Sequence, residues 1–124
     1  MVCAAELGAN IIPLGCLKNI VMSRIEKILE FINKGGEDSF LQHALALEYI
    51  KIEKYQDALE QFVALLNREP EYVGSYYHLG KLYEKLGQSS QAIQTYEQGM
   101  IVAKKQADQH SYNELMMAKE DLED

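Results

Sequence analysis

The central part of this chain carries the same residue pattern twice, and the two copies are separated by a constant 34 residues. A period of this length is typical of repeats that each fold into a helix–turn–helix unit. Matching positions hold chemically similar residues. These are Leu45, Ala46, Tyr49, Ala58, Leu59, Phe62 and Leu66 in the first copy, and Leu79, Gly80, Tyr83, Ala92, Ile93, Tyr96 and Met100 in the second. The pattern predicts two pairs of antiparallel helices that stack side by side.

The sizes of the repeated residues give a physical reason for such stacking. Small residues such as Ala46 and Ala58 allow two helix backbones to approach closely, and large ones such as Tyr49 and Phe62 fill the space beside them. Ridges on one helix then fit grooves on the next, so that pairs stack with a fixed offset. We therefore interpret the repeated residues as packing residues and not as a functional site.

The order of residues within each unit resembles the tetratricopeptide repeat. The positions that carry the resemblance are Leu45-Ala46, Tyr49, Ala58, Phe62 and Pro70 in the first unit, and Tyr76, Leu79-Gly80, Tyr83, Ala92 and Tyr96 in the second. The sequence departs from the pattern at Gln42, Ala46, Gly99 and Lys104. The resemblance covers about residues 39 to 106. It implies an all-α fold, an α-solenoid of antiparallel helix pairs whose concave face binds a peptide or a helix.

We expect this repeat domain to span residues 22–124, after a leader over 1–21 that is disordered or an upstream extension of the reading frame. Ser23 and Glu26 have the spacing of a capping box, and Pro13 interrupts the apolar part of the leader. Within the domain the pattern predicts a capping helix over 22–34, repeat 1 over 39–72, repeat 2 over 73–106, and a C-terminal capping helix over 108–122. An array of this kind needs capped ends to cover its last apolar faces.

Composition limits the partners and the compartment. The net charge of -7 argues against nucleic acid, whose phosphates favour basic proteins, and against an anionic membrane surface. No apolar run is long enough to cross a bilayer. The two cysteines, Cys3 and Cys16, lie in the leader and do not have the pattern of a disulfide framework, which favours a cytoplasmic protein.

The sequence offers no catalytic constellation. It lacks a phosphate-binding glycine loop, a zinc-ligand spacing, and a nucleophile with a base at motif distance. We therefore predict no enzyme activity, no cofactor and no metal site. His43 and His78 lie on the first helices of consecutive pairs, and we interpret them as structural or solvent-facing histidines.

The resemblance implies that the first helix of each pair lines a concave ligand groove. The residues that these helices offer are His43, Leu47, Ile50, Lys51, Tyr77, His78, Lys81, Glu84 and Lys85. We predict that seven of them form the peptide-binding groove, namely His43, Leu47, Lys51, Tyr77, His78, Lys81 and Lys85. Three lysines on one face of an acidic protein predict an acidic partner segment. The simpler interpretation, a solvated row of lysines without a ligand, stays open.

Two functions are consistent with these features of the sequence. The first is a protein–protein interaction module, an adaptor or scaffold that binds a peptide or helix of a partner protein in the groove. The alternative is a self-associating structural unit, a homodimer or larger homo-oligomer without a separate ligand, because short arrays have exposed edges to bury.

Overall fold

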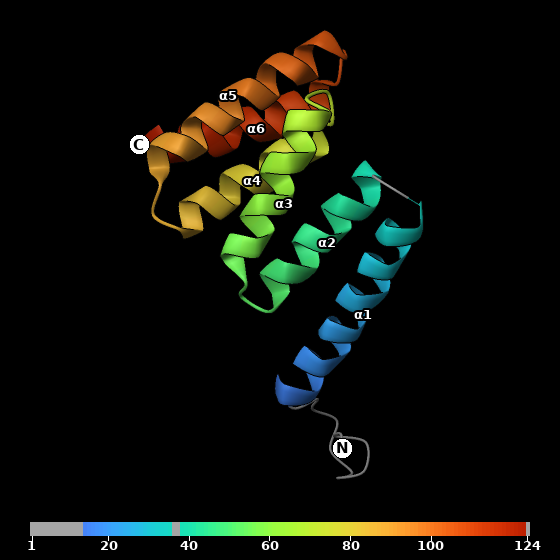
Figure 1. Ribbon diagram of the computed structural model, residues 1–124. Helices are drawn as coiled ribbons and strands as arrows, with labels where there is room; N and C mark the ends of the chain where they lie inside the picture. The colour runs from blue at the N-terminus through green and yellow to red at the C-terminus, as the bar shows by residue number, and fades with distance from the viewer. Residues whose placement is uncertain (1–13, 36–37, 124) are drawn as a thin grey trace.

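The computed structural model describes residues 14–35 and 38–123. In these residues it contains helices and no strands, which confirms the all-α solenoid of antiparallel helix pairs with a capping helix at each end. The helices are α1 (Leu14–Gly35), α2 (Ser39–Lys51), α3 (Tyr55–Arg68), α4 (Gly74–Lys85), α5 (Ser89–Lys105) and α6 (Gln109–Glu123), shown in Figure 1.

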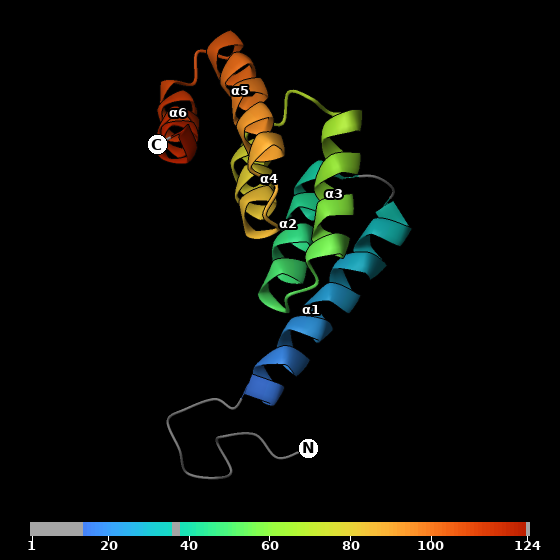
Figure 2. The same ribbon diagram turned by 90° about the vertical axis from the view of Figure 1, so that its left-hand side faces the viewer.

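The helices stack in chain order. Helix α2 pairs with α3 and α4 pairs with α5, and the two pairs meet where α3 packs on α4. Helix α1 runs along α2 at one end of the stack, and α6 packs against α5 and α4 at the other (Figures 1 and 2). The capping helices thus cover the open sides of the two repeats, as expected for a short array.

The beginning of α1 differs from our prediction. We placed a helix over 22–34 after an irregular leader, but α1 begins at Leu14, so that residues 14–21 are helical and Ser23 lies inside the helix instead of capping it. A proline disrupts a helix when it lies in the helix interior, and α1 begins after Pro13 in the sequence. The rest of the predicted leader, residues 1–13, lies outside the described residues.

A tertiary contact favours a helical conformation at Val21, immediately upstream of the predicted helix start. Val21 and Ile25 are each 3% exposed and pack with Leu45 of α2. Burying an aliphatic side chain of this size contributes about 1.5 to 3 kcal/mol. This contribution exceeds the weak local preference for a helix start at Ser23, because a capping box is worth only about 1 kcal/mol.

The helix ends follow the local sequence more closely. The Asp38 carboxylate caps α2 and accepts hydrogen bonds from the backbone N–H groups of Phe40 (2.9 Å) and Leu41 (3.3 Å). Gly87, with a φ of 76°, adopts the left-handed conformation that is typical of a glycine after the end of a helix. Glu53, one repeat earlier, has a φ of 61°, and Ala107 after α5 has a φ of 56°. These two turns force a residue with a Cβ into a region that favours glycine.

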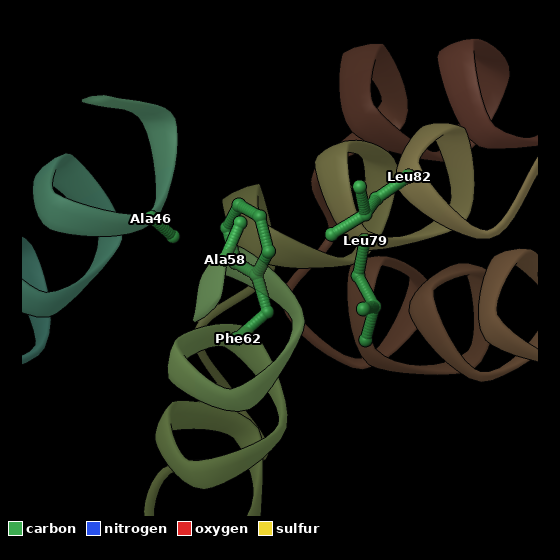
Figure 3. Close-up of a cluster of buried hydrophobic side chains, with 5 residues drawn as sticks. All are labelled: Ala46, Ala58, Phe62, Leu79 and Leu82. Atoms are coloured by element: carbon green, nitrogen blue, oxygen red, sulfur yellow. The ribbon is translucent and has the colours of Figure 1, made fainter. Parts of the chain in front are cut away.

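The core confirms that the repeated residues are packing residues. None of the fourteen matching positions is exposed, and the alanines among them, Ala46, Ala58 and Ala92, are completely buried. Figure 3 shows the cluster that joins the two pairs. Its buried members come from α2, α3 and α4 and are Ala46, Ala58, Phe62, Leu79 and Leu82. A second cluster joins α4, α5 and α6 through Tyr76, Ala92, Tyr96, Leu115 and Ala118.

Candidate peptide-binding groove

The first helices of the two repeats enclose a hollow of about 500 Å³. Helix α2 contributes Leu47 and Ile50 to its wall. Helix α4 contributes the remaining lining residues, His78, Lys81, Leu82, Glu84 and Lys85. Aliphatic side chains and two lysines therefore face the same space, a combination that suits a peptide with both apolar and acidic side chains.

A second hollow of about 170 Å³ lies between α4 and α6. Its lining residues are Tyr77, Lys81, Glu114, Met117, Ala118 and Asp121. Lys81 borders both hollows, so they adjoin along a face that crosses α2, α4 and α6. We call this surface the α2–α4–α6 groove. Its α2–α4 part carries Lys81 and Lys85 beside Glu84, and its α6 side carries Glu114 and Asp121.

The lysines of the region already have partners within the chain. The Nζ of Lys51 lies 3.3 Å from Glu48 Oε1, and the Nζ of Lys81 lies 3.5 Å from Glu84 Oε2. Lys85 lies over the ring of Tyr55, with its Nζ 6.0 Å from the ring centroid. The lysine side chains of the two ion pairs are 53% and 42% exposed, and such pairs contribute about 1 kcal/mol or less each. A ligand carboxylate can therefore compete for the ammonium groups.

Glu84 connects the groove to the core of the second repeat. Its carboxylate accepts a hydrogen bond from the phenol of Tyr96, a side chain with no exposed surface. Burial and this hydrogen bond raise the pKa of Tyr96 far above its usual range, which keeps the phenol protonated. The fixed phenol holds the Glu84 carboxylate at one place on the groove wall, next to the Lys81 ammonium group.

His43 and His78 lie next to each other at the junction of the two repeats. Their ring centroids are 5.3 Å apart, and the Nδ1 of His43 lies 2.7 Å from the Oγ of buried Ser75. Burial and the neighbouring His78 lower the pKa of His43 to about 4, and burial also lowers the pKa of His78, which Glu114 partly opposes. Both rings are neutral at pH 7, so they add no charge to the groove.

Comparison with known proteins identifies the family of this chain. A family model described as "Tetratricopeptide repeat" matches residues 50–112, which is more than half of the 124 residues. This chain is a tetratricopeptide repeat protein. A comparison with curated proteins found no match.

Solved structures support the assignment. The crystal structure of a tetratricopeptide repeat domain protein from Salinibacter ruber is 46% identical, covers 70% of this chain and 97% of its own, and superimposes with a TM-score of 0.67. A Bordetella parapertussis protein solved in solution is 26% identical, covers 79% of this chain and 85% of its own, with a TM-score of 0.70. The crystal structure of MamA is 16% identical, covers 82% of this chain and 70% of its own, and superimposes with a TM-score of 0.60. At this identity the likeness shows the fold alone. Tetratricopeptide repeats are in general non-catalytic modules that mediate protein–protein interaction.

The structure of this chain places the seven predicted groove residues in three different surroundings. Four of them, Leu47, His78, Lys81 and Lys85, line the α2–α4 hollow, and Tyr77 lines the α4–α6 hollow together with Lys81. His43 and Lys51 line neither hollow. The His43 ring packs against those of Phe62, Tyr72 and His78, and Lys51 lies at the end of α2 beside Glu48.

Sequence reasoning missed the contribution of α6. We interpreted this helix as a cap, and its inward side is indeed formed by Leu115 and Ala118. The adjacent stripe of Glu114, Met117 and Asp121 continues the groove, and the Met117 side chain is 63% exposed. The spacing of three and four residues along this stripe was a signal that could have shown a second exposed face of α6.

The described residues contain no group of three or more histidine, cysteine, aspartate or glutamate side chains that could hold a metal ion. None of the described helices is long and apolar enough to span a membrane.

Proposed function

We propose that the α2–α4–α6 groove binds a short segment of a partner protein that carries acidic and apolar side chains. The observation that supports this proposal is the shared position of Lys81, which joins an apolar, lysine-lined hollow to a second hollow on α6. Self-association without a separate ligand is the second candidate, and a different surface favours it.

The polarity of the groove suggests how such a segment is oriented. Its acidic residues lie at the α2–α4 hollow beside Lys81 and Lys85, where an apolar side chain also contacts Leu47 and Ile50. Its basic or neutral residues lie toward Glu114 and Asp121 on α6. A peptide bound in the reverse direction would place its acidic residues beside Glu114 and Asp121, so that charge selects one orientation.

Methionine adds tolerance to this recognition. The exposed Met117 side chain is unbranched and polarizable, and such side chains adapt to different apolar partners. The lysine pairs described above are weak enough to exchange their partner carboxylate for one from the ligand. We therefore expect recognition of a class of segments, with moderate affinity, and not of one unique sequence.

A peptide selection tests the proposal directly. The full chain is used to select binders from a displayed library of random short peptides, and the affinity of the enriched peptides is measured by isothermal titration calorimetry. We expect enrichment of peptides that combine acidic and apolar residues. Lys81→Glu/Lys85→Glu should weaken their binding by at least about tenfold, because two attractive charges become repulsive.

The matched control is Lys27→Glu/Lys105→Glu, which makes the same change in net charge at two exposed lysines of α1 and α5 outside the groove. Its affinity should stay within about twofold of the wild type, since the overall field alone has a small effect at physiological salt. Enriched peptides without acidic residues, or an equal loss in the control and the groove variant, would disprove the proposed site.

The predictions of a protein without enzyme activity or cofactor, without a nucleic-acid or membrane partner, and with a cytoplasmic location stay predictions. The comparisons carry only the general statement that the family mediates protein–protein interaction.

A further inference from the structure

A third hollow lies on the other helices of the two repeats. It has a volume of about 480 Å³ and separates α3 from α5, with Tyr76, Leu79 and Tyr83 of α4 contributing to its lining. The residues on its two sides are Val63, Leu66, Asn67 and Pro70, and Gln91, Gln94, Thr95, Gln98, Ile101 and Val102. We call this surface the α3–α5 groove. It shares only helix α4 with the α2–α4–α6 groove and otherwise uses different helices.

The absence of charge distinguishes the α3–α5 groove. None of the described residues that line it is acidic or basic, although a quarter of the chain is charged and the net charge is -7. Two copies of an acidic protein repel each other wherever charged faces meet. The α3–α5 groove is therefore a surface on which two copies can approach without placing like charges in contact.

The exposed side chains of α5 are complementary to themselves. Gln91, Gln94 and Gln98 form one stripe along the helix, and each carboxamide carries both hydrogen-bond donors and an acceptor. Consider two antiparallel copies of α5 that are related by a two-fold axis at the level of residue 96. Gln94 of each copy then lies opposite Gln98 of the other copy, so that the pair occurs twice. The same register places Ile101, which is 59% exposed, opposite the Gln91 end of the second groove.

From the charge-free lining and the self-complementary glutamine stripe, we infer that the α3–α5 groove binds a second copy of this chain and forms a two-fold symmetric dimer. Ile101 of each copy supplies an apolar contact, and the paired carboxamides set the register. This inference does not depend on the proposed peptide-binding function, because the α2–α4–α6 groove stays open in such a dimer.

Charge placed at the paired glutamines tests both the surface and its symmetry. We first expect sedimentation velocity of the wild type to show a reversible monomer–dimer equilibrium at protein concentrations up to about 1 mM. Gln94→Glu/Gln98→Glu should then weaken the dimer by at least about tenfold, because four like charges meet across the axis. Gln94→Lys/Gln98→Lys should weaken it as well, although the net charge falls in magnitude.

Two further measurements use the same two positions. Gln94→Glu/Gln98→Lys keeps the net charge at the wild-type value and places opposite charges across the two-fold axis, so its dimer should persist. A mixture of the double-glutamate and double-lysine variants should form a heterodimer. Circular dichroism checks that each variant is folded, which is expected because Gln94 and Gln98 are exposed.

Two controls separate this surface from others. Ser23→Glu/Asn33→Asp adds the same two negative charges on exposed positions of α1 and should leave the dimer unchanged. Met117→Glu alters the α2–α4–α6 groove and should also leave the dimer unchanged. A wild type that stays monomeric throughout, double-charge variants that dimerise normally, or a dimer disrupted by Met117→Glu would each overturn the inference. Unaltered peptide binding by the double-glutamate variant would keep the two proposals separate.

Discussion

Gly80 has no room for a side chain, and a single methyl group there tests the packing of the second repeat. A Cβ built on Gly80 lies 2.6 Å from Cζ and 2.7 Å from Cδ1 of the Tyr96 ring, and closer still to its Cε1. Tyr96 is completely buried and its hydroxyl donates to Glu84. The ring cannot withdraw without giving up that hydrogen bond and displacing its neighbours in the core.

The change in the free energy of unfolding follows from two opposing effects of Gly80→Ala. Overpacking a closed core costs about 1 to 3 kcal/mol, and the overlap with three ring atoms places this site at the upper end. Alanine is favoured over glycine inside a helix by about 1 kcal/mol. The free energy of unfolding should therefore decrease by about 2 kcal/mol, which is a large part of the total for a domain of this size.

Urea unfolding monitored by circular dichroism measures this difference. With an m-value of about 2 kcal/mol/M, a loss of about 2 kcal/mol lowers the midpoint by about 1 M. Gly74→Ala is the matched control, since nothing lies within 4 Å of the Cβ position at Gly74. The control should be neutral or stabilised by up to about 1 kcal/mol.

A double-mutant cycle assigns the cost to the ring. Tyr96→Leu removes Cε1 and Cζ, two of the three overlapping atoms, so Gly80→Ala should cost at least about 1 kcal/mol less in that background than in the wild type. An unchanged cost in the Tyr96→Leu background, or a Gly80→Ala variant as stable as the wild type, would refute the reasoning.

Three further predictions concern other parts of the chain. Because His43 has its pKa lowered from 6.5 to about 4 in the folded state, the unfolded chain binds more protons between these values. The free energy of unfolding should therefore fall by about 2 kcal/mol as the pH decreases from 6.5 to about 4, a value that allows for partial exposure of the ring. Urea midpoints measured across this pH range should vary less in His43→Gln than in the wild type. Ala107→Gly should raise the thermal midpoint by relieving a positive φ, worth about 1 kcal/mol, whereas Gly87→Ala should lower it by a similar amount; two shifts of the same sign would contradict this. Asp38→Ala should cost about 1 kcal/mol in urea unfolding through loss of the α2 cap, while Asp38→Asn should cost much less.

The sequence determined which faces of the helices are buried. The 34-residue offset identified Phe62 and Tyr96 as equivalent core residues, and both have no exposed surface. The Asp38 cap of α2 and the left-handed conformation of Gly87 also depend on local sequence. These features were predictable because helical periodicity, capping and turn conformation depend on residues a few positions apart.

Only the tertiary structure decided what lies between the helices. Position alone did not reveal that His43 packs beside Ser75, or that Glu114 and Met117 of α6 continue the groove. The charge-free α3–α5 groove likewise combines residues as far apart as Val63 and Ile101. Such arrangements depend on the lateral offset between helices, which interdigitating side chains from distant parts of the chain set together. For the same reason, α1 continues upstream of Ser23, because the contact of Val21 with α2 outweighs a local capping signal at Ser23.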